Sequence, residues 1–332
     1  MAVTLGLAGD TMLGREVAEH LRAKGPHSVF DPGVRDVAAE ADVVVLNLEC
    51  CLSDRGTQWP APGKPFFFRA PPIAAETLAW LGVDCVTLAN NHALDFSEQA
   101  LLDTVSLLSK AGIACVGAGS DVHAARRPAV LTARGTRLGI VGVTDHPLDF
   151  AAGEGRPGVA YADLRDGVPP WLVALVRDQR AEVDELLVTP HWGPNMTSAP
   201  LPYLRSAASV LLAAGATLIA GHSAHVFHGV ADSVIFDLGD FVDDYRVDPY
   251  LRNDLGIFVL LTLDGPRPRV LRVVPLALEY CFTRLARPSE YTWVRDRFVA
   301  ACQALDPDLE VSDEGDHLRV EVPRPGPVAG AA

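Results

Sequence analysis

The chain alternates short apolar strand patterns with helical patterns, and this alternation restricts the fold more than any other feature. In the first 120 residues the segments VTLGLAG, DVVVLNLE, CVTLAN and IACVGAG each have the composition of a buried strand, and helical segments separate them. A strand, a helix and another strand in succession are typical of α/β proteins with a largely parallel sheet. We therefore predict an α/β architecture.

The second half of the chain is richer in strands. AVLTARGTRLGIVGV predicts a hairpin around RGTR, and ELLVTPHWG and ATLIAGH predict two further strands. DSVIFDLGDFV and GIFVLLTLDGPRPRVLRVVPLAL predict consecutive antiparallel strands. We expect two sheets packed face to face with helices outside, in a single domain over residues 1–320. The Pro- and Gly-rich residues 321–332 predict a disordered tail.

The overall charge narrows the range of partners. The formal net charge is -14 with a pI near 5.1, whereas phosphate-backbone binding needs a basic face, so we expect no nucleic-acid partner. The N-terminus MAVTLGLAGD lacks the features of a signal peptide, and no run approaches the ~20 apolar residues of a membrane span. We expect a soluble, cytoplasmic protein without a membrane anchor.

Five predicted strands end on side chains that can bind a metal ion. These residues are Asp10; Asn47 and Glu49; Asn90, Asn91 and His92; His191; and His222 and His225 of GHSAHV. One Asp or Asn after a strand is usually a turn former, the preferred interpretation for Asn90, Asp54 or Asp145 taken singly. Five strand ends that mix carboxylates, amides and imidazoles are hard to explain by turn chemistry. Since ligands gather at the carboxyl ends of strands, we predict one shared site.

The types of side chain at these strand ends indicate a divalent-metal site. Carboxylate, amide and imidazole donors without cysteine fit such a site, and imidazole favours Zn, Mn, Fe or Ni over Ca. A carboxylate such as Glu49 can bridge two ions, and ions ~3.5–4 Å apart suit an in-line displacement on phosphorus. Bound water would then be the nucleophile, with its pKa lowered toward ~7, and Arg or His would stabilise charge or protonate the leaving group.

The order of the motifs carries a family resemblance. GDTMLGR, NLE, LANNHALD, HWG, GHSAHV and DLGDFV, spread over residues 3–243, together resemble the CapA family of capsule and poly-γ-glutamate biosynthesis proteins. That family belongs to the calcineurin-like metallophosphoesterase superfamily. The resemblance implies a four-layer α/β/β/α sandwich of two mixed sheets, with one or two divalent ions (Mn, Zn, Fe or Mg) at the strand ends.

The resemblance also implies a role for each site residue. Asp10 and His225 would bind the first metal, Glu49 would bridge, and Asn91, His191 and His222 would bind the second. His92 would contact the leaving group, and Asp95 would orient it. Arg15, Asn47 and Trp192 are candidates for contacting the substrate or supporting the ligands. Each of these three has an alternative of equal weight: Arg15 as a surface arginine, Asn47 as a turn former and Trp192 as a packing aromatic.

The chain departs from the family pattern at several positions, including Asn195 and Met196 after HWG and Ser223 and Ala224 within GHSAHV. The superfamily begins its first motif D-x-H, but this chain has Met12 at the third position, so the first site lacks one imidazole. That site is then weak, empty or filled by a harder ion such as Mg or Mn. The family's LGNF is LGDF here, with Asp240 in place of asparagine.

Three functions remain open from the sequence. The leading hypothesis is a metal-dependent enzyme that hydrolyses or transfers at a phosphoester centre. The second is formation or cleavage of amide bonds in γ-glutamyl or other peptide-like substrates, and it rests on the family resemblance. The third is a non-enzymatic protein that binds a metal or ligand, and Met12 and Asn195 favour it. The expected partner is a small-molecule or peptide-like substrate.

Overall fold

The computed structural model describes residues 2–265 and 269–322, which form two mixed sheets. In the larger sheet the order is β19 (Val311–Asp313), β20 (Leu318–Val322), β17 (Arg269–Glu279), β16 (Leu255–Leu263), β1 (Val3–Thr11), β2 (Val43–Leu48), β5 (Cys85–Thr87) and β6 (Ala114–Val116). Two further strands join it: β15 (Asp240–Val242) pairs with β1, and β18 (Phe282–Leu285) pairs with β17. The run from β1 to β6 is parallel, as the strand–helix alternation predicts.

The smaller sheet has the order β13 (Val230–Ala231), β14 (Val234–Ile235), β12 (Leu218–Ala220), β11 (Glu185–His191), β9 (Thr136–Thr144) and β8 (Ala129–Ala133). β8 and β9 form the predicted antiparallel hairpin, and β9, β11, β12 and β14 are parallel. Two short pairs lie apart from both sheets: β3 (Cys51–Leu52) with β4 (Arg69–Ala70), and β7 (Ala118–Gly119) with β10 (Gly158–Val159).

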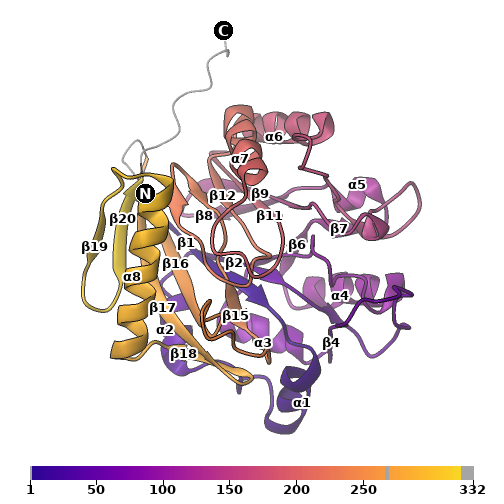
Figure 1. Ribbon diagram of the computed structural model, residues 1–332. Helices are drawn as coiled ribbons and strands as arrows, with labels where there is room; N and C mark the ends of the chain where they lie inside the picture. Colours follow the sequence, from indigo (N-terminus) through magenta and orange to yellow (C-terminus); the bar gives the residue numbers. More distant parts are fainter. Residues whose placement is uncertain (1, 266–268, 323–332) are drawn as a thin grey trace.

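Helices cover the outer faces of both sheets (Figure 1). They are α1 (Arg15–Lys24), α2 (Pro32–Ala38), α3 (Ala74–Leu81), α4 (Ser97–Lys110), α5 (Val122–Ala125), α6 (Pro170–Glu182), α7 (Pro202–Ala214) and α8 (Pro288–Leu305), with a 3₁₀ turn at Leu148–Phe150. α6 and α7 lie on one side of the strands, and α2 and α3 lie on the other. α3 ends where Gly82 adopts the left-handed conformation, φ +88°, that favours glycine.

Three apolar clusters between these layers confirm the predicted four-layer sandwich. In β2, Val44 and Leu46 face the core under α1, α3 and α4, whereas Val43 and Val45 face the core between the sheets. The third cluster packs β9, β11 and β12 against α6 and α7. Successive side chains of a strand point to opposite faces, so strands buried on both faces are apolar throughout.

The prediction that DSVIFDLGDFV forms one antiparallel strand is wrong. Its first part is β14 in the smaller sheet, and its second part is β15, which runs parallel to β1 in the larger sheet. The chain crosses between the sheets at Gly239, which has φ +72° and whose N–H donates to Asp237 Oδ1. The predicted tail also starts too early, because β20 extends to Val322; residues 323–332 lie outside the described part of the chain.

A buried ion pair joins the two sheets. Arg269 of β17 donates to Glu185 Oε2 of β11 at 2.8 Å and to Ser233 Oγ at 3.0 Å. Only 1% of Arg269 and 5% of Glu185 is exposed. Removing one partner of such a pair leaves a charge uncompensated in the interior.

We expect Arg269→Ala to lower the free energy of unfolding by about 3–5 kcal/mol, because it leaves the Glu185 carboxylate buried without this cation. The measurement is equilibrium denaturation in urea. The double change Arg269→Met with Glu185→Leu should recover most of the loss. Arg165→Ala, which removes the surface pair with Asp163, is the control and should leave the midpoint unchanged. An equal loss in the double variant would contradict the assignment.

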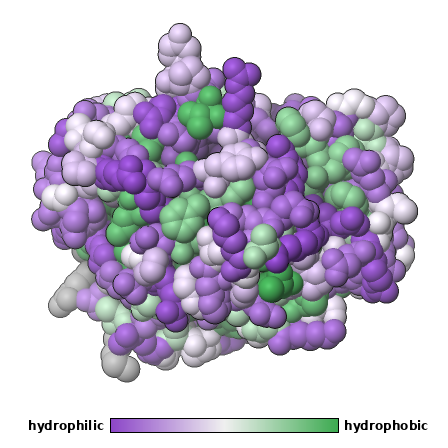
Figure 2. Space-filling model, turned by 90° about the horizontal axis from the view of Figure 1, so that it is seen from below, coloured by the Kyte–Doolittle hydropathy of each residue, from purple (hydrophilic) through white to green (hydrophobic). Residues whose placement is uncertain are grey.

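Within the described ranges, no helix combines the length and the apolar character that crossing a membrane requires. Figure 2 shows one face of the molecule, on which hydrophilic residues surround separate apolar areas. Large apolar side chains that are more than half exposed in the described chain are Phe66, Leu148, Tyr250 and Tyr280. Scattered exposed apolar groups of this kind are normal for a protein surface.

Candidate metal centre

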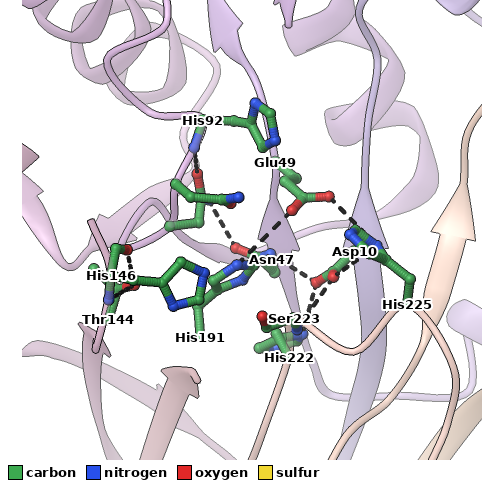
Figure 3. Close-up of polar contacts among 12 residues, drawn as sticks. Asp10, Asn47, Glu49, His92, Thr144, His146, His191, His222, Ser223 and His225 are labelled. Carbon is green, nitrogen blue, oxygen red and sulfur yellow. Dashed lines mark hydrogen bonds and ion pairs between the residues drawn. The ribbon is translucent and has the colours of Figure 1, made fainter. Parts of the chain in front are cut away.

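The polar strand ends of both sheets meet at one place (Figure 3). Asp10 lies in β1, and Glu49 directly follows the neighbouring strand β2. His191 ends β11, and His222 and His225 follow β12. His191 and His222 also pair through their backbones. The structure therefore brings together residues from strands of two different sheets.

Four of the side chains form a compact buried group. One ligand atom each from Asp10, Glu49, His225 and Asp240 lies within 4.8 Å of the others. His225 Nδ1 is 2.8 Å from Asp240 Oδ1, 3.5 Å from Asp10 Oδ2 and 3.9 Å from Glu49 Oε2. Three carboxylates and one imidazole can hold a divalent cation here.

A second group lies on the other side of Asp10 and Glu49. His222 Nδ1 is 3.4 Å from Asp10 Oδ1, and His191 Nε2 is 3.8 Å from Glu49 Oε1. Three buried atoms of this group have no hydrogen-bond partner in the described chain: Glu49 Oε1, His191 Nε2 and His222 Nδ1. Asn91 Oδ1, which the resemblance assigns to the second metal, is likewise buried without a partner in the described chain. Buried polar atoms are normally paired. Unpaired carboxylate and amide oxygens and imidazole nitrogens are suited to coordinating a cation.

The electrostatics of the group also suit a cation. Burial, together with the charge of Asp10, raises the pKa of the Glu49 carboxyl well above its usual range. Burial likewise raises the pKa of Asp240. Burial would raise the pKa of Asp10 too, but His222 and His191 hold it below its ordinary value. A divalent ion would compensate carboxylates whose charge is otherwise penalised by burial.

Neighbouring polar groups orient the ligands. Asn47 Nδ2 donates to Asp10 Oδ1 at 2.7 Å and lies 3.2 Å from His191 Nδ1. Asn90 Nδ2 in turn donates to Asn47 Oδ1 at 2.9 Å, and His222 Nε2 lies 3.0 Å from Thr189 Oγ1. Such contacts fix the ring and carboxylate orientations that metal binding needs. Asn47 is therefore placed as a supporting residue, and Asn90 is more than an isolated turn former.

His92 lies beside this centre and is held by Asp95. Its Nδ1 is 2.5 Å from Asp95 Oδ2, and its ring stacks on Phe68 with centroids 3.9 Å apart. Phe68 N and Lys64 Nζ also donate to the Asp95 carboxylate. Burial lowers the pKa of His92 to about 4. The geometry corresponds to the orienting contact that the motif order implied for Asp95.

Comparison with known families now adds to the geometry. The model of the family described as "Bacterial capsule synthesis protein PGA_cap" matches residues 4–245, a span that contains all the side chains described above. The chain belongs to this capsule synthesis family. The match ends at Tyr245, whose hydroxyl lies 3.4 Å from Glu49 Oε2.

Relatives in the PGA_cap family are similar over most of their length. A probable polyglutamine synthesis accessory protein of Mycobacterium tuberculosis is 31% identical over 89% of this chain and 90% of its own. The PGA biosynthesis protein CapA of Bacillus subtilis is 27% identical over 88% of this chain and 80% of its own. The capsule biosynthesis protein CapA of Bacillus anthracis is 27% identical over 83% of this chain and 68% of its own.

Two solved structures are distantly similar to this chain. NAD nucleotidase (NadN) of Haemophilus influenzae is 10% identical, with a TM-score of 0.45, over 90% of this chain and 56% of that one. A hypothetical protein from Thermus thermophilus is 15% identical, with a TM-score of 0.42, over 85% of this chain and 96% of that one. Similarity at this level carries no conclusion about chemistry.

Asp240 joins the buried group, whereas Met12 does not. Met12 is fully buried in the core under the helices, and its sulfur accepts from Gly14 N at 3.1 Å. Asp240 is the register partner of Asp10 between β15 and β1, so its carboxylate lies beside the same ligands. A carboxylate is a harder donor than imidazole.

Arg15 and Trp192 occupy different environments. Arg15 is partly exposed, lies 3.4 Å from Asp244 and packs over Phe66 with 5.3 Å to the ring centre. Trp192 is 1% exposed in the core beside α7, and its indole N–H donates to Phe236 O at 3.0 Å. These contacts favour the alternative in which Trp192 is a packing aromatic.

Sequence reasoning missed several polar residues around the centre, among them Asp240, Lys64 and His146. Asp240 was visible as a departure from the family motif, but its strand pairing was not. Lys64 Nζ donates to Asn91 O at 2.6 Å from a Pro-rich loop that gave no pattern. His146 follows β9 in the segment VTDHP, so the rule of polar strand ends extends to a sixth strand.

Proposed function

We propose that this PGA_cap family member is a metal-dependent hydrolase that acts at a phosphoester centre. The observation that carries the proposal is the set of buried atoms without a hydrogen-bond partner in the described chain on both sides of Asp10 and Glu49, with Asp240 Oδ2 on one side and His191 Nε2 and His222 Nδ1 on the other. Asp10, Glu49, Asp240 and His225 would hold one cation, and Asn91, His191 and His222 would hold a second. Divalent cations at these positions would supply Lewis acidity and lower the pKa of water that they bind.

The protein's own side chains would bind and orient the substrate. Asp95 accepts from His92 Nδ1, so His92 Nε2 is the atom available to the leaving-group oxygen. An anionic ester beside this ring favours its protonated form and opposes the effect of burial. Arg15, which is partly exposed and packs over Phe66, would pair with a negative group of the substrate.

A second candidate is hydrolysis of amide bonds in γ-glutamyl substrates. The names of the relatives favour it, because two of them refer to polyglutamine synthesis and PGA biosynthesis. The same donors could activate water for attack on an amide carbonyl. Family resemblance alone does not assign chemistry to a site, so this remains the second choice.

The test compares the two substrate classes on one metal-defined protein. The full chain is stripped with a chelator, reloaded with Mn, Zn or Mg, and assayed with p-nitrophenyl phosphate, bis-p-nitrophenyl phosphate and γ-glutamyl p-nitroanilide. We expect turnover of a phosphoester with at least one metal and none after chelation. Turnover of the anilide alone would establish the second candidate. Metal binding without any turnover would favour the non-enzymatic alternative.

A further inference from the structure

The loop after β9 places another imidazole at the edge of the centre. Asp145 directly follows β9, and its backbone N–H donates to His191 O at 3.2 Å, which joins this loop to the end of β11. His146 Nδ1 is 2.5 Å from Asp145 Oδ1. The rings of His146 and His191 lie side by side, with centroids 5.3 Å apart (Figure 3).

Hydrogen bonds hold the Asp145 carboxylate as an acceptor. Gly193 N and the Tyr203 hydroxyl each donate to Asp145 Oδ2 at 3.1 Å, and the side chain is only 6% exposed. Because the Asp145 carboxylate acts as an acceptor, it also accepts a hydrogen bond from His146, so His146 Nδ1 carries the hydrogen. In the neutral ring His146 Nε2 is then a hydrogen-bond acceptor.

Packing does not account for this imidazole. Gly193 and Tyr203 already donate hydrogen bonds to one oxygen of Asp145. The His146 side chain is 33% exposed, whereas the His191 side chain is 1% exposed. Among residues 2–265 and 269–322, the hydrogen bonds of His146 are made by its backbone O and N–H and by Nδ1, and none by Nε2. A fixed and partly exposed acceptor beside a candidate metal ligand is placed to contact a substrate.

We propose that His146 is a specificity-determining residue that accepts a hydrogen bond, through Nε2, from a hydroxyl or amine group of the substrate. Asp145 is its positioning residue. The inference rests on the proposed function in that the substrate's anionic part lies on the cations beside His191. The donor group would then lie on the part of the substrate that extends over the β9 loop.

The test uses three esters on the Mn-loaded full chain, with binding measured by calorimetry. Glycerol 3-phosphate offers a hydroxyl, phosphoethanolamine offers an amine, and propyl phosphate offers neither. We expect the wild-type protein to bind propyl phosphate about three- to tenfold more weakly than at least one donor ester, as loss of one hydrogen bond predicts. The donor ester that binds tightly identifies the type of group.

In His146→Ala this difference should fall below about twofold, with metal content unchanged. His146→Gln retains an acceptor and should keep part of the difference, whereas Asp145→Asn should lose it by releasing the ring. His317→Ala, at a histidine between β19 and β20 whose ring pairs with Asp316, is the control and should retain the full difference. An equal affinity for all three esters in the wild-type protein, an unchanged preference in His146→Ala, or loss of metal in that variant would overturn the proposal. Donor-dependent binding without turnover would contradict only the proposed hydrolase.

Discussion

Replacing Glu49 with glutamine is expected to remove bound metal from both positions and to reduce phosphoester turnover by about 10³-fold or more. Glu49 Oε2 faces His225 and Glu49 Oε1 faces His191, so one side chain serves both groups of donors. The change keeps the shape of the side chain but removes the charge, and a metal ion supplies several kcal/mol of transition-state stabilisation. Metal per protein by elemental analysis, with kcat/KM on the same samples, measures both effects.

Two further variants make this result specific. Asp240→Asn should weaken only the position beside His225, so the protein should lose part of its metal and retain the rest. Glu182→Gln, at an exposed residue of α6, is the matched control and should leave metal content and turnover unchanged. Full metal content in Glu49→Gln would show that this carboxylate does not bridge, and the two-position assignment would be withdrawn.

The second large effect is expected at His92. His92→Gln should reduce kcat by about 10²–10⁴-fold while metal content stays at the wild-type level, because this ring would serve the leaving group and is not placed as a metal ligand. The measurement is kcat with esters of different leaving groups. The loss should be greatest for alkyl esters, whose alkoxide needs a proton, and smaller for p-nitrophenyl esters.

Asp95→Asn provides the companion variant. It keeps the size of the side chain but weakens the hold on His92 Nδ1, so a smaller loss with the same leaving-group dependence is expected. An equal loss for all leaving groups in His92→Gln would argue against proton donation. Reduced metal content in that variant would move His92 into the metal-binding group instead.

The strand ends were the part of the site that local pattern predicted best. Asp10, Glu49, His191, His222 and His225 each follow or close an apolar strand, and parallel strands place such residues at one edge. The structure brings these five together. Trp192 carried the same signal, yet its side chain points into the apolar layer beside α7, because alternate residues of a chain leaving a strand face opposite sides.

Pairing between distant segments determined the partners of Asp240 and Asp145, which the local sequence pattern could not predict. Asp240 meets Asp10 only because DSVIFDLGDFV divides between two sheets at Gly239 and its second part aligns with β1. Asp145 has the local sequence of a turn former, but donors from the β11 loop and from α7 hold its carboxylate against His146. No periodicity within either segment encodes these partners.

The sequence by itself determined the kind of chemistry: the α/β layers, the family, and carboxylate, amide and imidazole donors at the ends of strands. Only the tertiary structure decided which donor atoms face one another, that Asp240 joins the group while Met12 lies in the core, and that His146 borders the site. The physical reason is that hydrophobic periodicity reports which face of a strand is buried, whereas the geometry of a site depends on the register between strands distant in sequence.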